Sequence, residues 1–447
     1  MILSDVPSDA TQSLFAPGRR AACVGAIALI SMLAFESIAV ATAMPAVAEA
    51  LDGLPLYALA FGATLATSVI GMTAAGQLCD KRGPYSASLV GLVAFLLGLL
   101  LAGFAPSMTV LVIGRALQGL GSGVLGVALY VGVGQVVPAP LHPKLFAMFA
   151  GAWVLPGLVG PAVASGLVSL LGWRSVFLAV AAAVPVAAAA MLPALKRAGG
   201  GTGEALRWGA MRWALLASGG ALMLHGASQQ SGAGAGLLFA AGLVAALIAA
   251  LRLLPAGTLV AARGLPSVIL LRGFIAAAFA SAEAFLPLLL TQRFGWSLTQ
   301  AGIALSAGAV TWSIGSAVQA RVTSDAARRR LLPTGFAVAA GGIAVVMAPV
   351  AFAALPHGLA LVGWVGVGLG IGLSFPMLSV LLLKLSPPEQ QGGNTSALQL
   401  SDALVSSAAL ALAGLLFDPA TRQVLPVLVM AFVLAAAASA VSPRALR

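Results

Sequence analysis

Long apolar stretches alternate with short polar segments along almost the whole chain. A helix needs about 20 mostly apolar residues to cross a lipid bilayer, and on that basis the pattern predicts about 14 membrane helices. The predicted helices cover residues 21–45, 56–78, 85–104, 109–136, 145–171, 176–195, 211–226, 233–251, 267–291, 298–318, 331–354, 359–383, 395–417 and 424–441.

The composition fits a membrane protein and excludes an ordinary soluble domain. Hydrophobic residues occupy 60% of the 447 positions and charged residues only 8%, whereas a soluble domain carries about 25% charged residues. The formal net charge of +11 would also suit a nucleic-acid partner. The basic residues gather in short loops on one side, however, so the expected partner is the lipid bilayer and not nucleic acid.

The positions of Lys and Arg predict the orientation. With the N-terminus in the cytoplasm, nineteen of the 23 basic residues fall inside, Arg174, Arg293 and Arg422 fall outside, and Arg115 lies within a helix. Because Lys and Arg concentrate in cytoplasmic loops, we expect both termini in the cytoplasm of a bacterium and the chain in its inner (plasma) membrane.

The predicted fold class is an all-α polytopic membrane protein with two six-helix bundles and an inserted two-helix hairpin. The expected segments are a cytoplasmic tail (1–19), an N-terminal bundle (20–197), a linker with the hairpin (198–264), a C-terminal bundle (265–442) and a tail (443–447). The stretch 211–226 is only about 16 residues long, so an interfacial position stays open for it.

Four charged residues lie deep inside the predicted helices: Glu36, Arg115, Glu283 and Asp402. A charge at that depth costs at least about 2.5–3.5 kcal/mol on insertion scales, and such residues face a protein interior or a water-filled cavity. Desolvation favours the neutral form of a buried carboxyl group. The pattern therefore predicts candidates for reversible proton binding, with a purely structural role as the alternative for each.

Three blocks of sequence carry further information. A basic turn follows the second predicted helix and contains Gly76, Asp80, Lys81, Arg82 and Gly83. The fourth predicted helix holds Arg115, Gln118 and Gly119. The fifth contains Pro156, Gly157, Gly160, Pro161 and Gly166. Glycine permits tight turns, and proline with small residues gives a bent helix with a smooth, closely packed face.

From about residue 21 to residue 441, the chain resembles the major facilitator superfamily, and within it the fourteen-helix drug:proton antiporters. The basic turn matches the superfamily's G-x-L-x-D-[RK]-x-G loop, and the second block matches R-x-x-Q-G. The third block is similar to the antiporter pattern G-x-x-x-G-P-x-x-G-G. Pro156 replaces its first glycine, and Ala164 with Ser165 replaces its last pair.

The resemblance implies a role for each block. In the family the basic turn latches the outward-facing state; here Pro84 and Tyr85 stand where further basic residues are usual, so a weaker latch is expected. The arginine of the second block takes part in proton coupling, and the third block is typical of export. Glu36 resembles the family's acid in the first helix. No family role is carried onto Asp402.

These observations predict a proton-coupled exporter of hydrophobic or cationic small molecules, a multidrug efflux protein that works by alternating access. It would be a monomer and no enzyme, and it would use the proton gradient with no cofactor or metal, since the chain holds no G-x-x-x-x-G-K-[ST] nucleotide loop. Candidates for lining the substrate cavity are Met32, Phe35, Phe279, Phe285, Trp312 and Gln399. A dedicated metabolite or lipid exporter, proton-coupled uptake, and a non-transporting receptor or scaffold remain the alternatives.

Overall fold

The computed structural model describes residues 13–138, 141, 145, 148–149, 151–198, 208–227, 230, 233–322, 325–386, 391–418 and 420–446. Within these residues the chain folds into fourteen α-helices. The predicted tail 1–19 and the linker before the hairpin lie partly outside the described residues.

The helices fall into three groups along the chain. The first is α2 (Arg20–Ala50), α3 (Tyr57–Arg82), α4 (Pro84–Gly103), α5 (Met108–Val136), α7 (Val154–Leu171) and α8 (Arg174–Ala198). The hairpin is α9 (Trp208–Ala227) and α10 (Ala233–Leu253). The last group is α11 (Leu265–Leu288) with its continuation η4 (Leu289–Arg293), α12 (Leu298–Ala320), α13 (Asp325–Ala351), α14 (Leu359–Leu385), α15 (Gln391–Leu416) and α16 (Leu425–Val441).

Each predicted apolar stretch corresponds to one of these helices. Among the described residues, twelve helices are long and apolar enough to cross a membrane. The apolar part of α7 (Leu155–Leu171) is shorter than those spans, and α9 is not among them. The chain is thus a multi-pass helical protein, and a spanning position of α9 stays a prediction.

One predicted helix boundary is wrong. The stretch 145–171 does not form one helix, because the chain turns at Ala152 and Trp153 and α7 begins at Val154. Pro156 explains the interruption: it has no N–H to donate to the carbonyl of Ala152, and its ring crowds that carbonyl. The next residue, Gly157, donates its N–H to the carbonyl of Trp153 at 2.9 Å.

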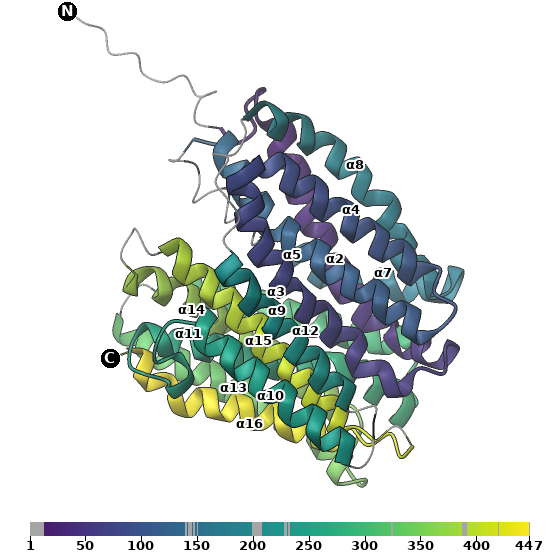
Figure 1. Ribbon diagram of the computed structural model, residues 1–447. Helices are drawn as coiled ribbons and strands as arrows, with labels where there is room; N and C mark the ends of the chain where they lie inside the picture. Colours follow the sequence, from purple (N-terminus) through teal and green to yellow (C-terminus); the bar gives the residue numbers. More distant parts are fainter. Residues whose placement is uncertain are drawn as a thin grey trace, which may run out of the picture.

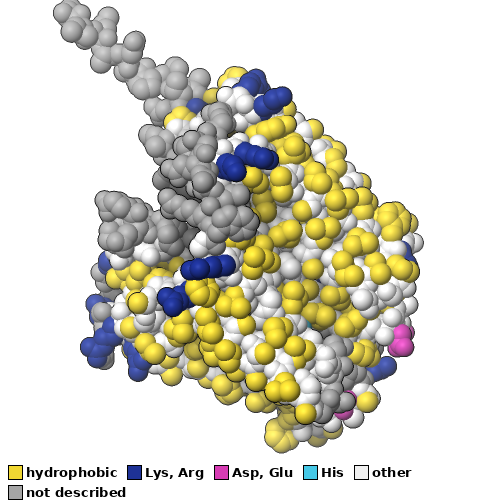
Figure 2. Space-filling view, in the orientation of Figure 1, with side chains coloured by type: hydrophobic (Ala, Val, Ile, Leu, Met, Phe, Trp, Pro, Cys, Tyr) yellow, Lys and Arg dark blue, Asp and Glu magenta, His cyan; other side chains and the backbone are white. Residues whose placement is uncertain are grey.

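The two six-helix groups form two bundles that lie side by side in Figure 1, with α2 to α8 in one and α11 to α16 in the other. Helix α9 packs against both bundles, on α3 and α15. Figure 2 shows hydrophobic side chains over most of this face, as expected for a surface in lipid. Lys and Arg gather near the end where the chain termini lie, and the Asp and Glu seen in this view lie at the opposite end.

Basic residues define the two sides of the molecule. Helix α3 ends with Lys81 and Arg82, and α8 ends with Lys196 and Arg197. We call this the cytoplasmic side and the opposite one the outer side, in accord with the concentration of Lys and Arg in cytoplasmic loops.

The same close helix contact recurs in both bundles. Thr67 on α3 donates to the carbonyl of Ala116 on α5 at 2.6 Å, and Thr311 on α12 donates to that of Val365 on α14 at 2.8 Å. Three residues after each acceptor stands a glycine, Gly119 or Gly368, whose missing Cβ leaves room for the neighbouring backbone. The two bundles are therefore built on one repeated packing scheme.

Candidate functional site

Two of the buried charges form an ion pair inside the N-terminal bundle. Glu36 on α2 and Arg115 on α5 are each 4% exposed, and the guanidinium contacts the carboxylate directly. Arg115 also donates to the side-chain oxygen of Gln118 at 2.6 Å and to the carbonyl of Ala60 at 3.2 Å. The amide of Gln118 in turn donates to the carbonyl of Gly98 at 3.0 Å. A buried charge is tolerated only with such partners, so this network joins four helices through one guanidinium.

The glycine of the R-x-x-Q-G block places this arginine. A Cβ on Gly119 would collide with the carbonyl of Thr64, so glycine lets α5 lie directly on α3. The hydroxyl of Thr64 donates to the carbonyl of Arg115 at 3.1 Å, which fixes the backbone at the base of the side chain. The block thus contributes both the charge and the close helix contact that aims it.

A second ion pair lies in the C-terminal bundle, between Arg272 on α11 and Asp402 on α15. The Nε of Arg272 is 2.9 Å from one carboxylate oxygen and 3.1 Å from the other. Its Nη1 donates to the carbonyl of Phe375 and the hydroxyl of Ser379, at 3.2 and 3.1 Å. The guanidinium also lies over the Phe375 ring, with Cζ 3.3 Å from the ring centroid.

Arg272 is not among the expected site residues, because it lies near the start of the predicted helix 267–291 and so falls with the cytoplasmic charges. The structure thus adds Arg272 to the four charges that the sequence places deep inside the helices. Helix α11 begins at Leu265, so Arg272 stands two turns inside it. One signal could have identified it: Arg263 already supplies the basic residue of that loop, and Arg272 follows an unbroken apolar run.

Glu283 differs from the other two acids within the helices. Within the described residues, no hydrogen bond or ion pair holds its carboxyl group, although the residue is half-buried and stands in the apolar helix α11. Phe279 precedes it by four residues and so lies on the same helix face. The Phe279 ring stacks on Trp364 at 5.4 Å and meets the edge of Trp312 at 5.1 Å. Trp312 meets Phe375 at 5.6 Å, so a run of aromatic rings extends from beside Glu283 to the Arg272–Asp402 pair.

The remaining cavity candidates lie in different environments. Met32 and Phe35 on α2 and Trp312 on α12 are half-buried, and Gln399 on α15 is exposed. Phe285 is fully buried, with Tyr57 and Phe417 at ring distances of 5.4 and 5.3 Å. Phe285 is therefore part of a closed aromatic cluster on the outer side.

The proline- and glycine-rich block gives α7 a smooth face toward both bundles. Gly160 lies against Phe35 and Ile38 of α2, and Gly157 lies against Ala309 of α12. The carbonyl of Pro161 occupies the place that a side chain at position 302 of α12 would need. Gly166, near the outer end, has no such neighbour. This packing gives no direction of transport. It does place α7 in contact with α2 of its own bundle and with α12 of the other bundle.

Hydrogen bonds between the two bundles lie on the outer side. The Tyr57 hydroxyl donates to the carbonyl of Ala284 at 2.8 Å, and Ser165 and Thr299 are joined through their hydroxyls at 3.1 Å. Ser407 on α15 donates to the carbonyl of Gly62 on α3 at 3.4 Å. The structure therefore describes a state in which the outer ends of the bundles are in contact.

The basic turn is short and tight. Helix α3 ends at Arg82, Gly83 adopts φ 84°, and α4 begins at Pro84. Only glycine adopts that φ readily, and proline suits the first position of a helix because its missing N–H would have no partner there. Gly76 has open space around it, and the side chain of Asp80 lies outside the described residues. The latch role stays a prediction.

The whole-chain comparison decides the family. The sequence profile of the Major Facilitator Superfamily matches residues 24–410. The chain belongs to the major facilitator superfamily. It is thus a membrane transporter of small molecules and not an enzyme.

Individual relatives and structures agree with this assignment. A Mycobacterium tuberculosis (strain H37Rv) protein named probable multidrug-efflux transporter is 28% identical over 444 residues, covering 94% of this chain and 92% of the relative. The multidrug efflux pump SdrM of Staphylococcus aureus (strain N315) is 28% identical over 159 residues, about a third of each chain. A crystal structure of a peptide transporter with sulfate superposes with a TM-score of 0.68 at 17% identity, covering 94% of both chains, which shows the shared fold.

Proposed function

We propose that this superfamily member is a proton-coupled exporter of hydrophobic or cationic small molecules, in the manner of the fourteen-helix drug:proton antiporters. The observation that carries the proposal is Glu283, an acid within α11 with no cation beside it among the described residues. An ionised carboxylate there has no positive charge to offset its cost in the membrane, and protonation removes that cost. Glu283 would therefore bind a proton from one side of the membrane and release it to the other during each transport cycle. The names of the full-length relatives support the export direction.

The arrangement of groups gives each acid a separate task. Glu283, one helical turn from Phe279, whose ring meets Trp312, would exchange its proton as substrate enters or leaves. A cationic substrate would replace the proton as the partner of the carboxylate, which makes the two compete. Glu36 is held by Arg115, so its protonation would release the guanidinium to Gln118 and the Ala60 carbonyl alone. Asp402 would act likewise with Arg272.

In the transport cycle, the two bundles would alternate between a state with their outer ends in contact and a state with their outer ends apart. In the described state the outer ends touch through Tyr57 and Ser407. Substrate would load from the cytoplasm, the outer contacts would separate, and protonation from outside would favour release. The energy comes from the proton gradient, with differential binding in the two states as the coupling.

Glu283→Gln tests the proposal, because it fixes a neutral side chain of nearly the same shape. Inverted vesicles with a pH-gradient readout would be screened with lipophilic cations and neutral drugs. We expect the variant still to bind neutral ligand but to lose uphill export. Glu49→Gln is the matched control, because Glu49 is exposed at the outer end of α2. Full gradient-driven export by Glu283→Gln would remove Glu283 from the mechanism and make Asp402 the next candidate.

The same screen separates the alternatives. A dedicated exporter would accept a single compound class, and a proton-coupled uptake protein would accumulate substrate in the opposite direction. A receptor or scaffold would show binding without any flux. Its chain would gain nothing from the insertion cost of the buried acids.

A further inference from the structure

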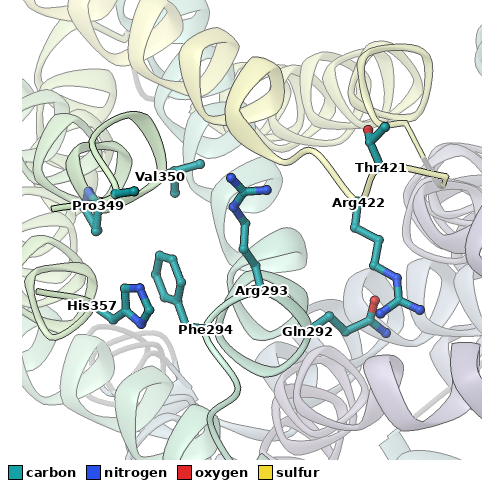
Figure 3. Close-up of a pocket in the computed structure, with 9 residues that line it drawn as sticks. Gln292, Arg293, Phe294, Pro349, Val350, His357, Thr421 and Arg422 are labelled. Atoms are coloured by element: carbon teal, nitrogen blue, oxygen red, sulfur yellow. The ribbon is translucent and has the colours of Figure 1, made fainter. Parts of the chain in front are cut away.

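A cavity on the outer side of the C-terminal bundle lies apart from the buried acids. It has a volume of about 390 Å³, in the range of about 300–1,000 Å³ that small-molecule sites occupy. It lies where η4, the end of α13 and the loop between α15 and α16 meet (Figure 3). The polar and aromatic residues that line it are Gln292, Arg293, Phe294, His357, Thr421 and Arg422.

Two of the three outer basic residues line this one cavity. Arg293 and Arg422 come from segments far apart in the sequence, and Figure 3 shows Arg293 between the loop that bears Arg422 and the helix end that bears Val350. Basic residues are depleted on the outer side of membrane proteins. A negatively charged ligand would explain why two of these rare residues line the same cavity.

The third outer arginine shows what a structural role would look like. Arg174 donates to the carbonyl of Ala105 at 3.0 Å and lies over the Trp173 ring at 4.2 Å. Within the described residues, no hydrogen bond or ion pair ties Arg293 or Arg422 to the protein. Both residues are exposed and line the cavity, and in Figure 3 the Arg422 side chain extends toward Gln292 while that of Arg293 extends in another direction.

The loop that presents Arg422 is held in an unusual shape. Arg422 adopts φ 53°, a left-handed conformation that residues other than glycine rarely adopt. Asp418 supports the turn by accepting from the Thr421 hydroxyl at 2.6 Å and from the backbone N–H of Ala420 at 3.0 Å. These hydrogen bonds, that of Thr421 first, lower the pKa of the Asp418 carboxyl. The carboxylate is thus engaged within the loop and does not line the cavity.

Gln292 supplies an independent observation. Its side-chain oxygen is buried and has no hydrogen-bond partner within the described residues. A buried acceptor without a donor costs free energy, and this one belongs to a residue that lines the cavity. A ligand that carries a hydroxyl or ammonium donor would satisfy it.

We propose that this outer cavity binds a phosphate-bearing group that also carries a hydrogen-bond donor, with the phosphate on Arg293 and Arg422 and the donor on Gln292. Guanidiniums bind phosphate oxygens in paired hydrogen bonds. Phosphatidylglycerol in the outer leaflet and soluble glycerol phosphate share this chemistry, with a phosphate and free hydroxyls. The site is separate from the export cycle proposed above and does not depend on it.

The test uses the whole chain in two settings. In the first, the protein is placed in phosphatidylcholine nanodiscs with increasing phosphatidylglycerol, and retained lipid is counted by native mass spectrometry. In the second, detergent-solubilised protein is titrated with glycerol 3-phosphate or inorganic phosphate, and the midpoint of thermal unfolding is followed. We expect the wild type to retain a phosphatidylglycerol molecule, or to be stabilised by glycerol 3-phosphate if the source is soluble.

The Arg293→Gln/Arg422→Gln double variant should bind the same probe about tenfold or more weakly, since each charged hydrogen bond contributes more than a neutral one. Arg174→Gln is the matched control and should keep the wild-type affinity. Both arginines are exposed, so the unliganded double variant should unfold at the wild-type temperature; if it does not, the two single variants replace it. Equal binding by the double variant, or no response of the wild type to either probe, overturns the proposal.

Discussion

Glu36, Asp402 and Glu283 occupy three different environments, although all three are acids within membrane helices. Arg115 compensates Glu36 and Arg272 compensates Asp402, whereas Glu283 has an aromatic face beside it and no cation among the described residues. The cation beside a paired carboxylate offsets part of the cost of removing its charge from water, while an uncompensated carboxylate needs a proton or a cationic ligand. We therefore expect that the three acids cannot replace one another in a transport cycle.

The Glu36–Arg115 pair can be tested through stability. Arg115→Gln should leave a buried carboxylate without its cation and destabilise the protein by about 3–5 kcal/mol, because the partner left behind is the main cost. The double variant Glu36→Gln/Arg115→Gln removes both charges and should be clearly more stable than Arg115→Gln alone. Unfolding in nanodiscs at neutral pH measures both. Glu36→Gln alone completes the set. If the double variant loses as much stability as Arg115→Gln and Glu36→Gln lose together, the two side chains act independently, which would contradict the pair.

At this scale the sequence predicted which charges are buried better than which charges meet. Hydropathy alone placed Glu36 and Arg115 inside helices, but the two are 79 positions apart, and their pairing depends on how α2 and α5 pack. Hydropathy does not separate Arg272 from the loop charges, because a basic residue two turns into a helix resembles one at the end of a cytoplasmic loop. Its partner is 130 positions away and could not be inferred from spacing.

The inserted hairpin is joined to the bundles by a buried histidine. His225 near the end of α9 is fully buried, and its imidazole interacts with the backbone of Ser407 on α15. On the other side, the imidazole fills the space that a Cβ on Gly62 of α3 would need. Through this histidine, α9 packs against both bundles at the same point.

A pair of glycine substitutions can test this contact. Gly62→Ala should force α9 away from α3 and lower the stability by about 1–3 kcal/mol, as overpacking does. Gly219→Ala on α9 is the matched control, because a Cβ there meets nothing within 4 Å. That change should be neutral or stabilising, since alanine favours a helix over glycine. Thermal unfolding of the two variants should separate them, and equal midpoints would contradict the contact.

The topology of the hairpin is a separate question, because α9 is not among the twelve apolar spans. Gln230, which is exposed in the loop after α9, should lie outside the cell if both helices cross the membrane. A Gln230→Cys variant would be labelled with a membrane-impermeant thiol reagent, after Cys23 and Cys79, both buried, are replaced by Ala. Labelling from the cytoplasmic side alone would place the loop between α9 and α10 in the cytoplasm. The two helices would then not cross the membrane as a hairpin, which would contradict the prediction of fourteen spanning helices.

Most helices were predictable because each is a long apolar run, and their ends follow charges and glycines. The exception is the region before α7, where hydropathy continues without interruption through Ala152 and Trp153. A hydropathy pattern records burial in lipid and does not record the missing N–H of Pro156. The contact of α9 with both bundles was equally hidden, since it depends on a glycine at one site and a histidine at another.

The whole molecule is described in one state of its cycle, with the outer ends of the bundles in contact. Ser165→Cys and Thr299→Cys, introduced without Cys23 and Cys79, should be close enough to be cross-linked, because the two hydroxyl oxygens are 3.1 Å apart. Oxidation should then stop transport, and a reductant should restore it. Ser169→Cys with Thr299→Cys is the control pair, because Ser169 is exposed and lies one helical turn beyond Ser165. Undiminished transport by the oxidised first pair would mean that these outer ends need not separate.

The position of α9 also divides the lipid-facing perimeter unequally. Two seams run between the bundles, one between α3 and α15 and the other between α7 and α12. Among the described residues, the inserted hairpin covers the first seam, through α9, and no extra helix covers the second. Acyl chains and lipophilic compounds dissolved in the bilayer would thus meet a covered flank at α3 and an uncovered one at α7. We therefore expect a lipophilic compound that enters laterally from the membrane to use the seam between α7 and α12 and to pass the proline- and glycine-rich face of α7.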